Sequence, residues 1–256
     1  MEVIAVVNQK GGVAKTTTAV ALAQALTRMG YKVLLQDTDP RRDATDTYRA
    51  QYLNVATVYD VLIAEDSIMD SVQRTEQGDI LASDKMLEDI EQKLTELGRE
   101  YKLREKIKAM PEDAYDFIII DTPPQPGVIL NNALTAADTC IIPITPDRYA
   151  LRGVEQLNQA IARVRKYSNR DLKIAGFLVT KCDPQLNLTK RTFKDLPPVA
   201  EQMKTRMFKT FIREAVAAKE AQAKRLSIYE YAPDSNPAKD YAAFAEELLA
   251  VMKEEV

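Results

Sequence analysis

One stretch near the N-terminus decides the fold: Val3-Ile4-Ala5-Val6-Val7-Asn8-Gln9-Lys10-Gly11-Gly12-Val13-Ala14-Lys15-Thr16-Thr17. It begins with an apolar run rich in β-branched residues, which predicts a buried strand. Two glycines and a Lys-Thr-Thr sequence follow, and an alanine-rich helix is expected from Thr18 to Arg28. Strand, tight glycine turn and helix form the layout of a phosphate-binding loop, because the backbone N–H groups of the turn and of the helix start point at the anion.

The side chains of this loop fit the same chemistry. The ammonium group of Lys15 can neutralise the outer phosphates, and the hydroxyl of Thr16 can coordinate Mg²⁺. The common form of such a loop has glycine six residues before the lysine and directly before it, where this chain has Gln9 and Ala14. If position 14 requires a positive φ, alanine costs about 1–2 kcal/mol there, whereas in the helical region it costs nothing. The sequence leaves both alternatives open.

Two carboxylates follow the second expected strand, residues 32–36. Asp37 and Asp39 stand just past the end of this strand, in Asp37-Thr38-Asp39-Pro40. Such a place beside a phosphate loop suits Mg²⁺ and a water molecule. The same residues also suit a capped turn before a helix. We favour the functional interpretation because the phosphate loop is close in the fold.

A third carboxylate ends a further buried strand. Residues 115–121 read Tyr-Asp-Phe-Ile-Ile-Ile-Asp, and Thr122-Pro123-Pro124 terminates them. A fully apolar strand with a carboxylate at its C-terminal tip is typical of a buried parallel strand and of the Walker B motif. In this interpretation Asp121 holds Mg²⁺ through water. The alternative is a buried strand that ends in a capping aspartate.

Strands alternate with helices along the rest of the chain. Further strands are expected at 79–83, 139–144 and 173–180, and helices at 57–62, 86–97, from 146 to about 166, and 237–254. This alternation predicts an α/β fold, with a single doubly wound, mostly parallel sheet flanked by helices and ligands at the carboxyl ends of the strands. Residues 1–256 are expected to form one domain.

Composition excludes several classes of protein. Apolar residues make up 46% of the 256 residues and charged residues 29%, as in ordinary globular proteins. No apolar run has membrane-spanning length, and the chain enters a strand directly, so we expect a cytoplasmic protein without a signal peptide. Cys140 and Cys182 lack metal-site spacing and are expected to be reduced thiols. The chain has no histidine, which excludes histidine catalysis and histidine metal sites.

Positive charge is concentrated in one segment. The whole chain has a net charge of −3, but residues 186–225 hold ten Lys/Arg and four Asp/Glu. A basic segment on an acidic body favours a localised surface for polyanions, and binding to phosphates requires no base-reading helix. The alternative is an ordinary solvated helix surface. The candidate DNA contacts are Lys204, Arg206, Lys209, Lys219, Lys224 and Arg225.

The phosphate loop, the aspartate pair, the Walker B strand and residues 131–153 together resemble the ParA/MinD family of ATPases, whose deviant loop reads Lys-Gly-Gly-x-Gly-Lys-Thr-Thr. The resemblance covers nearly the whole chain and is greatest to short ParA/Soj-type partition ATPases without an N-terminal helix-turn-helix. It departs after Asp39, where the family's Pro-Gln-Gly-Asn is Pro40-Arg41-Arg42-Asp43. These two arginines can bind phosphate, a partner or DNA, or remain solvated.

The resemblance implies a mechanism. ATP and Mg²⁺ bind at the loop, with nucleotide contacts from Lys10, Gly11, Gly12, Val13, Ala14, Lys15, Thr16 and Thr17. The metal is held by Thr16, Asp39 and Asp121, and Asp39 orients the attacking water. Lys10 reaches across an ATP-dependent homodimer to the partner's phosphates, so that Lys10, Lys15 and Asp39 are the catalytic residues. The dimer binds non-specific DNA on the nucleoid, and a ParB-type protein stimulates slow hydrolysis.

The base pocket is less clearly marked. Thr180-Lys181-Cys182-Asp183 is close to the Asn-Lys-x-Asp sequence with which GTPases read guanine, but threonine replaces the asparagine. The family resemblance implies adenine, with Lys181, Asp183 and, from the loop at 210–214, Ile212 in the pocket.

Several alternatives remain. The last helix is amphipathic but mostly acidic, which argues against a membrane-targeting tail because such tails carry a basic polar face. A MinD-like or other protein-positioning ATPase without DNA binding nevertheless stays an alternative. A hydrolysis-impaired nucleotide-binding module is another, because of Ala14. An iron–sulfur electron carrier would need a symmetric pair of cluster cysteines, which Cys140 and Cys182 do not resemble.

Overall fold

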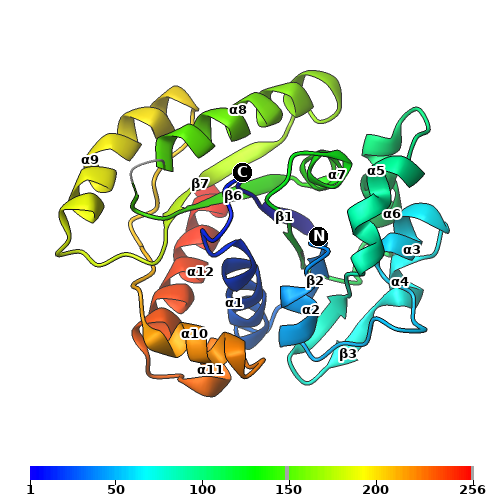
Figure 1. The fold of residues 1–256 in the computed structure, drawn as a ribbon, viewed down its shortest axis with the longest axis horizontal. Helices are drawn as coiled ribbons and strands as arrows, with labels where there is room; N and C mark the ends of the chain where they lie inside the picture. Colours follow the sequence, from blue (N-terminus) through cyan, green and yellow to red (C-terminus); the bar gives the residue numbers. More distant parts are fainter. Residues whose placement is uncertain (148–149, 255–256) are drawn as a thin grey trace.

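A single twisted sheet forms the centre of the computed structural model, which describes residues 1–147 and 150–254 (Figure 1). Within these residues the sheet has seven strands in the order β3-β4-β2-β5-β1-β6-β7, and β3 alone is antiparallel to its neighbour. The strands are β1 Glu2–Val6, β2 Val33–Asp37, β3 Gln73–Thr75, β4 Gly78–Leu81, β5 Phe117–Asp121, β6 Thr139–Ile144 and β7 Lys173–Val179. The expected α/β class with a mostly parallel, doubly wound sheet is confirmed.

Helices cover both faces of this sheet (Figure 1). Side chains of β1 alternate between two cores, with Val3 and Ala5 in one and Ile4 and Val6 in the other. The first core lies under α3 Val58–Ile63, α5 Ile90–Lys93, α6 Lys102–Lys108, α7 Val128–Ala136, α8 Ala150–Tyr167 and α9 Asn187–Gln202. The second lies under α1 Lys15–Arg28, α2 Asp43–Thr47, α10 Val216–Ala223, α11 Ile228–Tyr231 and α12 Asn236–Glu254. Burial on both faces explains why the strands read as continuous apolar runs.

Local sequence sets the ends of helices α1 and α3. Gly30, at φ 94°, terminates α1, and the N–H groups of Gly30 and Tyr31 donate to the carbonyls of Thr27 and Leu26. This pair of hydrogen bonds is the Schellman motif that glycine favours. Helix α3 begins at a capping box in which the backbone N–H and the hydroxyl of Thr57 both donate to Asp60. Because Gly30 terminates α1, strand β2 follows the helix after a short turn. The carboxyl end of β2 then lies on the same side of the sheet as the phosphate loop.

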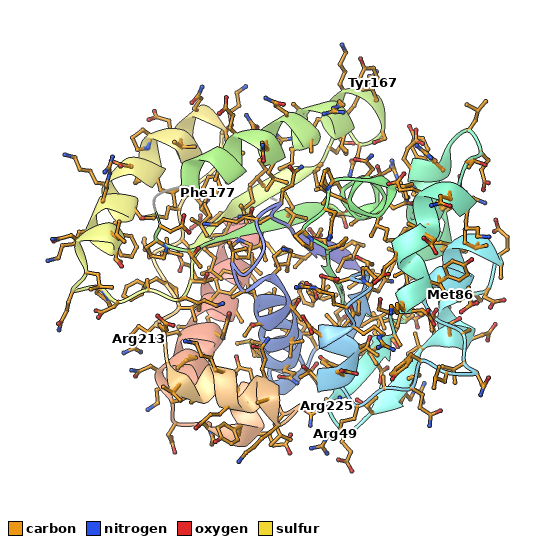
Figure 2. All side chains as sticks on the ribbon, viewed as in Figure 1. Arg49, Met86, Tyr167, Phe177, Arg213 and Arg225 are labelled. Carbon is orange, nitrogen blue, oxygen red and sulfur yellow. The ribbon has the colours of Figure 1, made fainter. Side chains whose placement is uncertain are left out.

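The expected helix at 86–97 is wrong. The chain forms a 3₁₀-helix η1 at Lys85–Asp89 and the single turn α5, and Leu97 is fully exposed. Leu87 and Ile90 are buried, and their spacing of three suits a 3₁₀ turn as well as an α-helix. Met86, which the expected helix counted as apolar core, is exposed at the outer rim of the molecule (Figure 2). The remaining short elements on this side are α4 Ile68–Ser71 and η2 Arg99–Tyr101.

The segment after α9 runs beside β7 without forming a strand. Its contacts with the sheet are isolated bridges, Phe177 to Met207 and Cys182 to Arg213. Gly176 makes this approach feasible, because a Cβ atom there would lie 2.9 Å from the carbonyl oxygen of Arg206. The expected opening of α8 includes Arg148 and Tyr149, which lie outside the described residues. Among the described residues, no helix is long and apolar enough to cross a membrane.

Candidate functional site

The phosphate loop joins β1 to α1 and is held by a buried asparagine. The side chain of Asn8 accepts a hydrogen bond from the backbone N–H of Lys10 at 2.9 Å and donates to the carbonyl of Pro143 at 2.8 Å. The loop then turns through two positions of positive φ, 78° at Gly12 and 65° at Ala14. Position 14 therefore requires the left-handed conformation, which settles the alternative that the sequence left open and places strain at Ala14.

The side chain of Lys15 curls back inside the loop. It is buried, and its Nζ donates to the carbonyl oxygen of Lys10 at 3.3 Å. Burial lowers the pKa of Lys15, and the charges of Asp121 and Asp39 oppose this effect. An ammonium group held among the N–H groups of a glycine loop is the arrangement that binds a phosphate chain. The structure thus places Lys15 near the carboxylates of Asp121 and Asp39.

The carboxylates at the tips of β2 and β5 lie on adjacent, paired strands, with Asp37 opposite Asp121. Asp37 accepts hydrogen bonds from the N–H and hydroxyl of Thr45 at 2.8 and 2.7 Å. Both carboxylate oxygens of Asp121 are buried and form no hydrogen bond of normal geometry within the described residues, although the Thr16 hydroxyl lies close enough to favour the ionised carboxylate. Burial raises the pKa of Asp37 to about 7, and burial together with the charge of Asp37 raises the pKa of Asp121 well above its ordinary value.

These features fit a magnesium ion. Two orphaned carboxylate oxygens in the interior are costly unless a cation completes the site. The hydroxyl of Thr16, at the start of α1, lies near Asp121 and lowers its pKa. The described residues hold no cluster of three or more acidic or cysteine ligands. Mg²⁺ keeps several waters and uses few protein groups, so one hydroxyl and one carboxylate are sufficient protein ligands for it.

Asp39 is engaged by an arginine that the sequence left without a role. Arg41 donates from Nη2 to Oδ2 of Asp39 at 3.0 Å, and its backbone N–H donates to Oδ1 at 3.0 Å. The side chain of Asp39 is 2% exposed, whereas that of Arg41 is 55% exposed. The pair therefore lies at the boundary between the buried strand tips and solvent.

Lys10 lies at the mouth of the loop and points away from Lys15. Its Nζ pairs with Oδ2 of Asp147, which also accepts from the hydroxyl of Thr145 at 2.8 Å. The side chain of Lys10 is 31% exposed. Gly153 of α8 passes close by, since a Cβ there would lie 3.6 Å from Cβ of Lys10.

An open pocket borders the loop on the side of α10. Ala14, Thr17, Lys181 and Ile212 all line it. Lys181 adopts φ 50° and donates from Nζ to the carbonyl of Gly12 at 2.8 Å. Asp183, by contrast, is not among the lining residues and accepts from the backbone N–H of Gln185 at 2.9 Å. The structure thus brings two of the three expected base-pocket residues together and places Asp183 in a turn.

The candidate DNA-binding residues lie on two segments of the chain. Lys204, Arg206 and Lys209 line a cleft between β7 and α12, together with Glu247 and Glu254. The second group consists of Lys219, Lys224 and Arg225 on and after α10. Lys219 pairs with Glu214 at 2.8 Å and Arg225 with Asp46 at 3.5 Å, while Lys224 lies over the ring of Tyr231 at 4.7 Å. Figure 2 shows Arg225 beside α2, far along the molecule from Arg213, which pairs with Asp240 of α12.

Sequence reasoning missed some residues that shape the site. Asn8 and Thr180 fix the loop, the latter by donating from its hydroxyl to the carbonyl of Val13 at 3.0 Å. Polar residues at the ends of β1 and β7, next to a glycine loop, were a signal for these contacts. No such signal existed for Asp147, which contacts Lys10 from 137 residues away. Cys140 and Cys182 are both buried, and burial raises their thiol pKa values to about 12 and about 11.

Comparisons with known proteins agree with this geometry. A family model described as "AAA domain" matches residues 1–174. The sporulation initiation inhibitor protein Soj of Bacillus subtilis is 36% identical over 253 residues, 97% of this chain and 98% of that protein. The chromosome partitioning protein ParA of Caulobacter vibrioides is 37% identical over 201 residues, 77% of this chain and 75% of that protein.

Solved structures show the same architecture, one of them with ADP and magnesium bound. A Mycobacterium smegmatis structure described as cobyrinic acid a,c-diamide synthase with bound ADP and magnesium is 32% identical, with a TM-score of 0.86 over 100% of this chain and 97% of the other. The cell division ATPase MinD of Pyrococcus furiosus is 25% identical, with a TM-score of 0.78 over 98% and 99% of the two chains. On the phosphate loop, the strand-tip aspartates and these matches, the chain belongs to the ParA/Soj family of P-loop partition ATPases.

Proposed function

We propose that this protein is an ATP-dependent dimerising switch that binds DNA without sequence preference and partitions a replicon together with a ParB-type partner. In this proposal it works in the cytoplasm on the nucleoid. The observation that carries it is the pair of lysines in the phosphate loop. Lys15 is buried inside the loop, whereas Lys10 lies at its mouth with its side chain 31% exposed. One loop thus offers a cation to its own nucleotide and another to a neighbouring subunit.

The residues have distinct roles in this proposal. The backbone N–H groups of residues 11–16 and the ammonium of Lys15 hold the phosphates. Thr16 and the unpartnered carboxylate of Asp121 hold magnesium, which neutralises charge on the phosphate oxygens when bound. Asp39, buried at the tip of β2, orients the attacking water. Lys181 and Ile212 line the pocket that takes the adenine.

Lys10 couples hydrolysis to dimerisation. In the single chain its ammonium is neutralised by Asp147. A second subunit brings the phosphates of its nucleotide to this face, and their greater negative charge competes with one carboxylate for the lysine. The monomer therefore lacks one of the two cations that stabilise charge on the transferred phosphoryl group. Hydrolysis then dissolves the dimer and releases DNA.

Gel filtration with ATP and with ADP, followed by a DNA shift on each pool at low salt, tests this function. We expect a dimer with ATP that shifts DNA of any sequence, and a monomer with ADP that does not. The change Lys10→Ala should abolish the dimer while nucleotide binding persists, and Lys15→Ala should abolish nucleotide binding itself. Lys93→Ala, at an exposed lysine far from the loop, is the matched control. An ATP-loaded dimer that leaves DNA unshifted would point to a protein-positioning switch without DNA binding.

A hydrolysis-impaired switch is the second candidate, because Ala14 occupies a left-handed position at φ 65°. Strain at the residue before Lys15 can displace the loop from its best geometry for the phosphates. A steady-state ATPase assay with DNA and a ParB-type partner separates the two candidates. Turnover that the partner stimulates favours the active switch, whereas tight ATP binding without turnover favours the impaired one.

A further inference from the structure

The loop after β2 brings a guanidinium group onto the carboxylate that our proposal assigns to the attacking water. Arg41 approaches Asp39 with two nitrogens. Its Nε lies 3.4 Å from Oδ1 and 3.3 Å from Oδ2, and its Nη2 lies 3.0 Å from Oδ2. This is the forked contact that arginine makes with a carboxylate. The backbone N–H of Arg41 adds a further bond to Oδ1 at 3.0 Å.

These bonds leave the carboxylate little capacity for water. A carboxylate offers about four acceptor positions, and the guanidinium and the backbone N–H of Arg41 occupy those that face the loop. The side chain of Asp39 is only 2% exposed, so a water molecule cannot reach its carboxylate from another side.

Arg41 can leave this position. Its side chain is 55% exposed, and the carboxylate of Asp43 lies 3.7 Å from the same Nη2. The side chain of Asp43 is half exposed, and its carboxylate can pair with the guanidinium of Arg41 at the surface. Arg41 therefore has two acceptors, one buried at the site and one at the rim, and a small side-chain rotation transfers it between them. Arg42, the neighbouring arginine, instead lies over the ring of Tyr52 at 3.8 Å.

We propose that Arg41 is a positioning residue that restrains Asp39, so that ATP hydrolysis waits for the guanidinium to release the carboxylate. This inference rests on the proposed ATPase function. It assigns the slow basal turnover that the proposed function includes to a contact within one subunit.

Basal ATPase rates without DNA or partner test the inference in three variants. Arg41→Gln should raise kcat about five- to tenfold with KM for ATP unchanged within about twofold, because one forked ion pair must otherwise break before each turnover. Arg41→Lys keeps the charge but loses the fork and should fall between wild type and Arg41→Gln. Arg42→Gln removes the same charge one residue away and should leave the rate as in wild type.

The outcomes separate this inference from the proposed function. A lower kcat in Arg41→Gln, or equal rates in Arg41→Gln and Arg42→Gln, would overturn the restraint. A lower kcat would mean that Arg41 contacts the phosphates instead. If wild type and every variant hydrolysed no more ATP than Lys15→Ala, the proposed ATPase function itself would fail. Circular dichroism melting curves confirm that each variant is folded before its rate is compared.

Discussion

The carboxyl ends of β2 and β5, together with the phosphate loop, and the basic segment at 186–225 are both charged regions. They differ in how deeply their charged groups are buried. At the strand tips, Lys15, Asp37, Asp39 and Asp121 are all buried. The charges of Asp39 and Asp121 act on the pKa of Lys15, and those of Asp37 and Asp39 act on the pKa of Asp121. In the basic segment the charged groups are exposed, and many face acidic partners from distant parts of the chain. Arg225 meets Asp46 of α2, and Arg213 meets Asp240 of α12.

This difference shows what a local sequence pattern can carry. Residues at the carboxyl ends of paired parallel strands must meet, because strand pairing fixes their separation. Net charge counted along a segment carries no such constraint, since neutralising groups come from elsewhere in the fold. The net positive charge of residues 186–225 is therefore an upper bound on the positive charge that this surface offers to DNA.

The largest effect that we predict is the dependence of stability on pH, which arises from the buried Asp37 at the tip of β2. Burial raises the pKa of Asp37 from its ordinary value of 3.8 to about 7. The folded state then binds more protons than the unfolded state between these values, so the free energy of unfolding falls as pH rises through about 7. One proton corresponds to about 1.4 kcal/mol per pH unit. Urea unfolding of the magnesium-free protein at pH 5.5, 6.5 and 7.5 should show greatest stability at pH 5.5.

The variant Asp37→Asn is the control for this dependence. It keeps an oxygen acceptor for Thr45 but cannot ionise. Its stability relative to wild type should therefore improve by about 1–3 kcal/mol between pH 5.5 and pH 7.5. If the stability of wild type and of Asp37→Asn changed with pH in the same way, Asp37 would titrate normally. The strand tips would then be electrostatically more like the basic segment than the structure indicates. Saturating Mg²⁺ should weaken the dependence by stabilising the ionised carboxylates.

The basic segment predicts an intermediate effect that depends on pairing. Lys204 and Lys209 are exposed, and their ammonium groups form no ion pair within the described residues. Lys219 and Arg225 are also exposed but pair with Glu214 and Asp46. Changing Lys204 and Lys209 together to glutamine should reduce the slope of log affinity for DNA against log salt by about 1.8, since each phosphate contact contributes about 0.9. DNA shifts of the ATP-loaded protein at several salt concentrations measure this slope.

The double variant of Lys219 and Arg225 to glutamine removes the same total charge. Its slope should change by less than that of the first pair, because each cation must leave a carboxylate before it meets a phosphate. Equal slope changes would show that pairing within the chain does not limit DNA contacts. In that case the charge count from the sequence would be the better guide to the surface.

The sequence predicts most of the sheet and the phosphate end of the site for the same physical reason. Apolar strands, glycine turns and strand-tip carboxylates are local signals, and β6 falls on the predicted residues 139–144. Contacts between distant residues have no local signal, which is why Lys10 with Asp147 was not predicted. The expected helix at 86–97 failed because its pattern also fits a 3₁₀-helix. Asp183 lies in a turn that its sequence also suits, and its role in the base pocket stays a prediction.

The smallest effect that we predict is on stability, from a change at Ala14. This residue lies between the strand tips and the basic segment, in the loop that borders the base pocket. Its φ of 65° costs about 1–2 kcal/mol for alanine, which glycine would not pay. Glycine however loses about 0.5–1 kcal/mol more conformational entropy on folding. The change Ala14→Gly should therefore raise the free energy of unfolding by about 1 kcal/mol or less in urea titrations. A rise in kcat together with this small gain in stability would show that strain at Ala14 slows hydrolysis. A gain in stability at constant kcat would show that the strain does not affect hydrolysis. Loss of stability would mean that the loop is not strained at this residue.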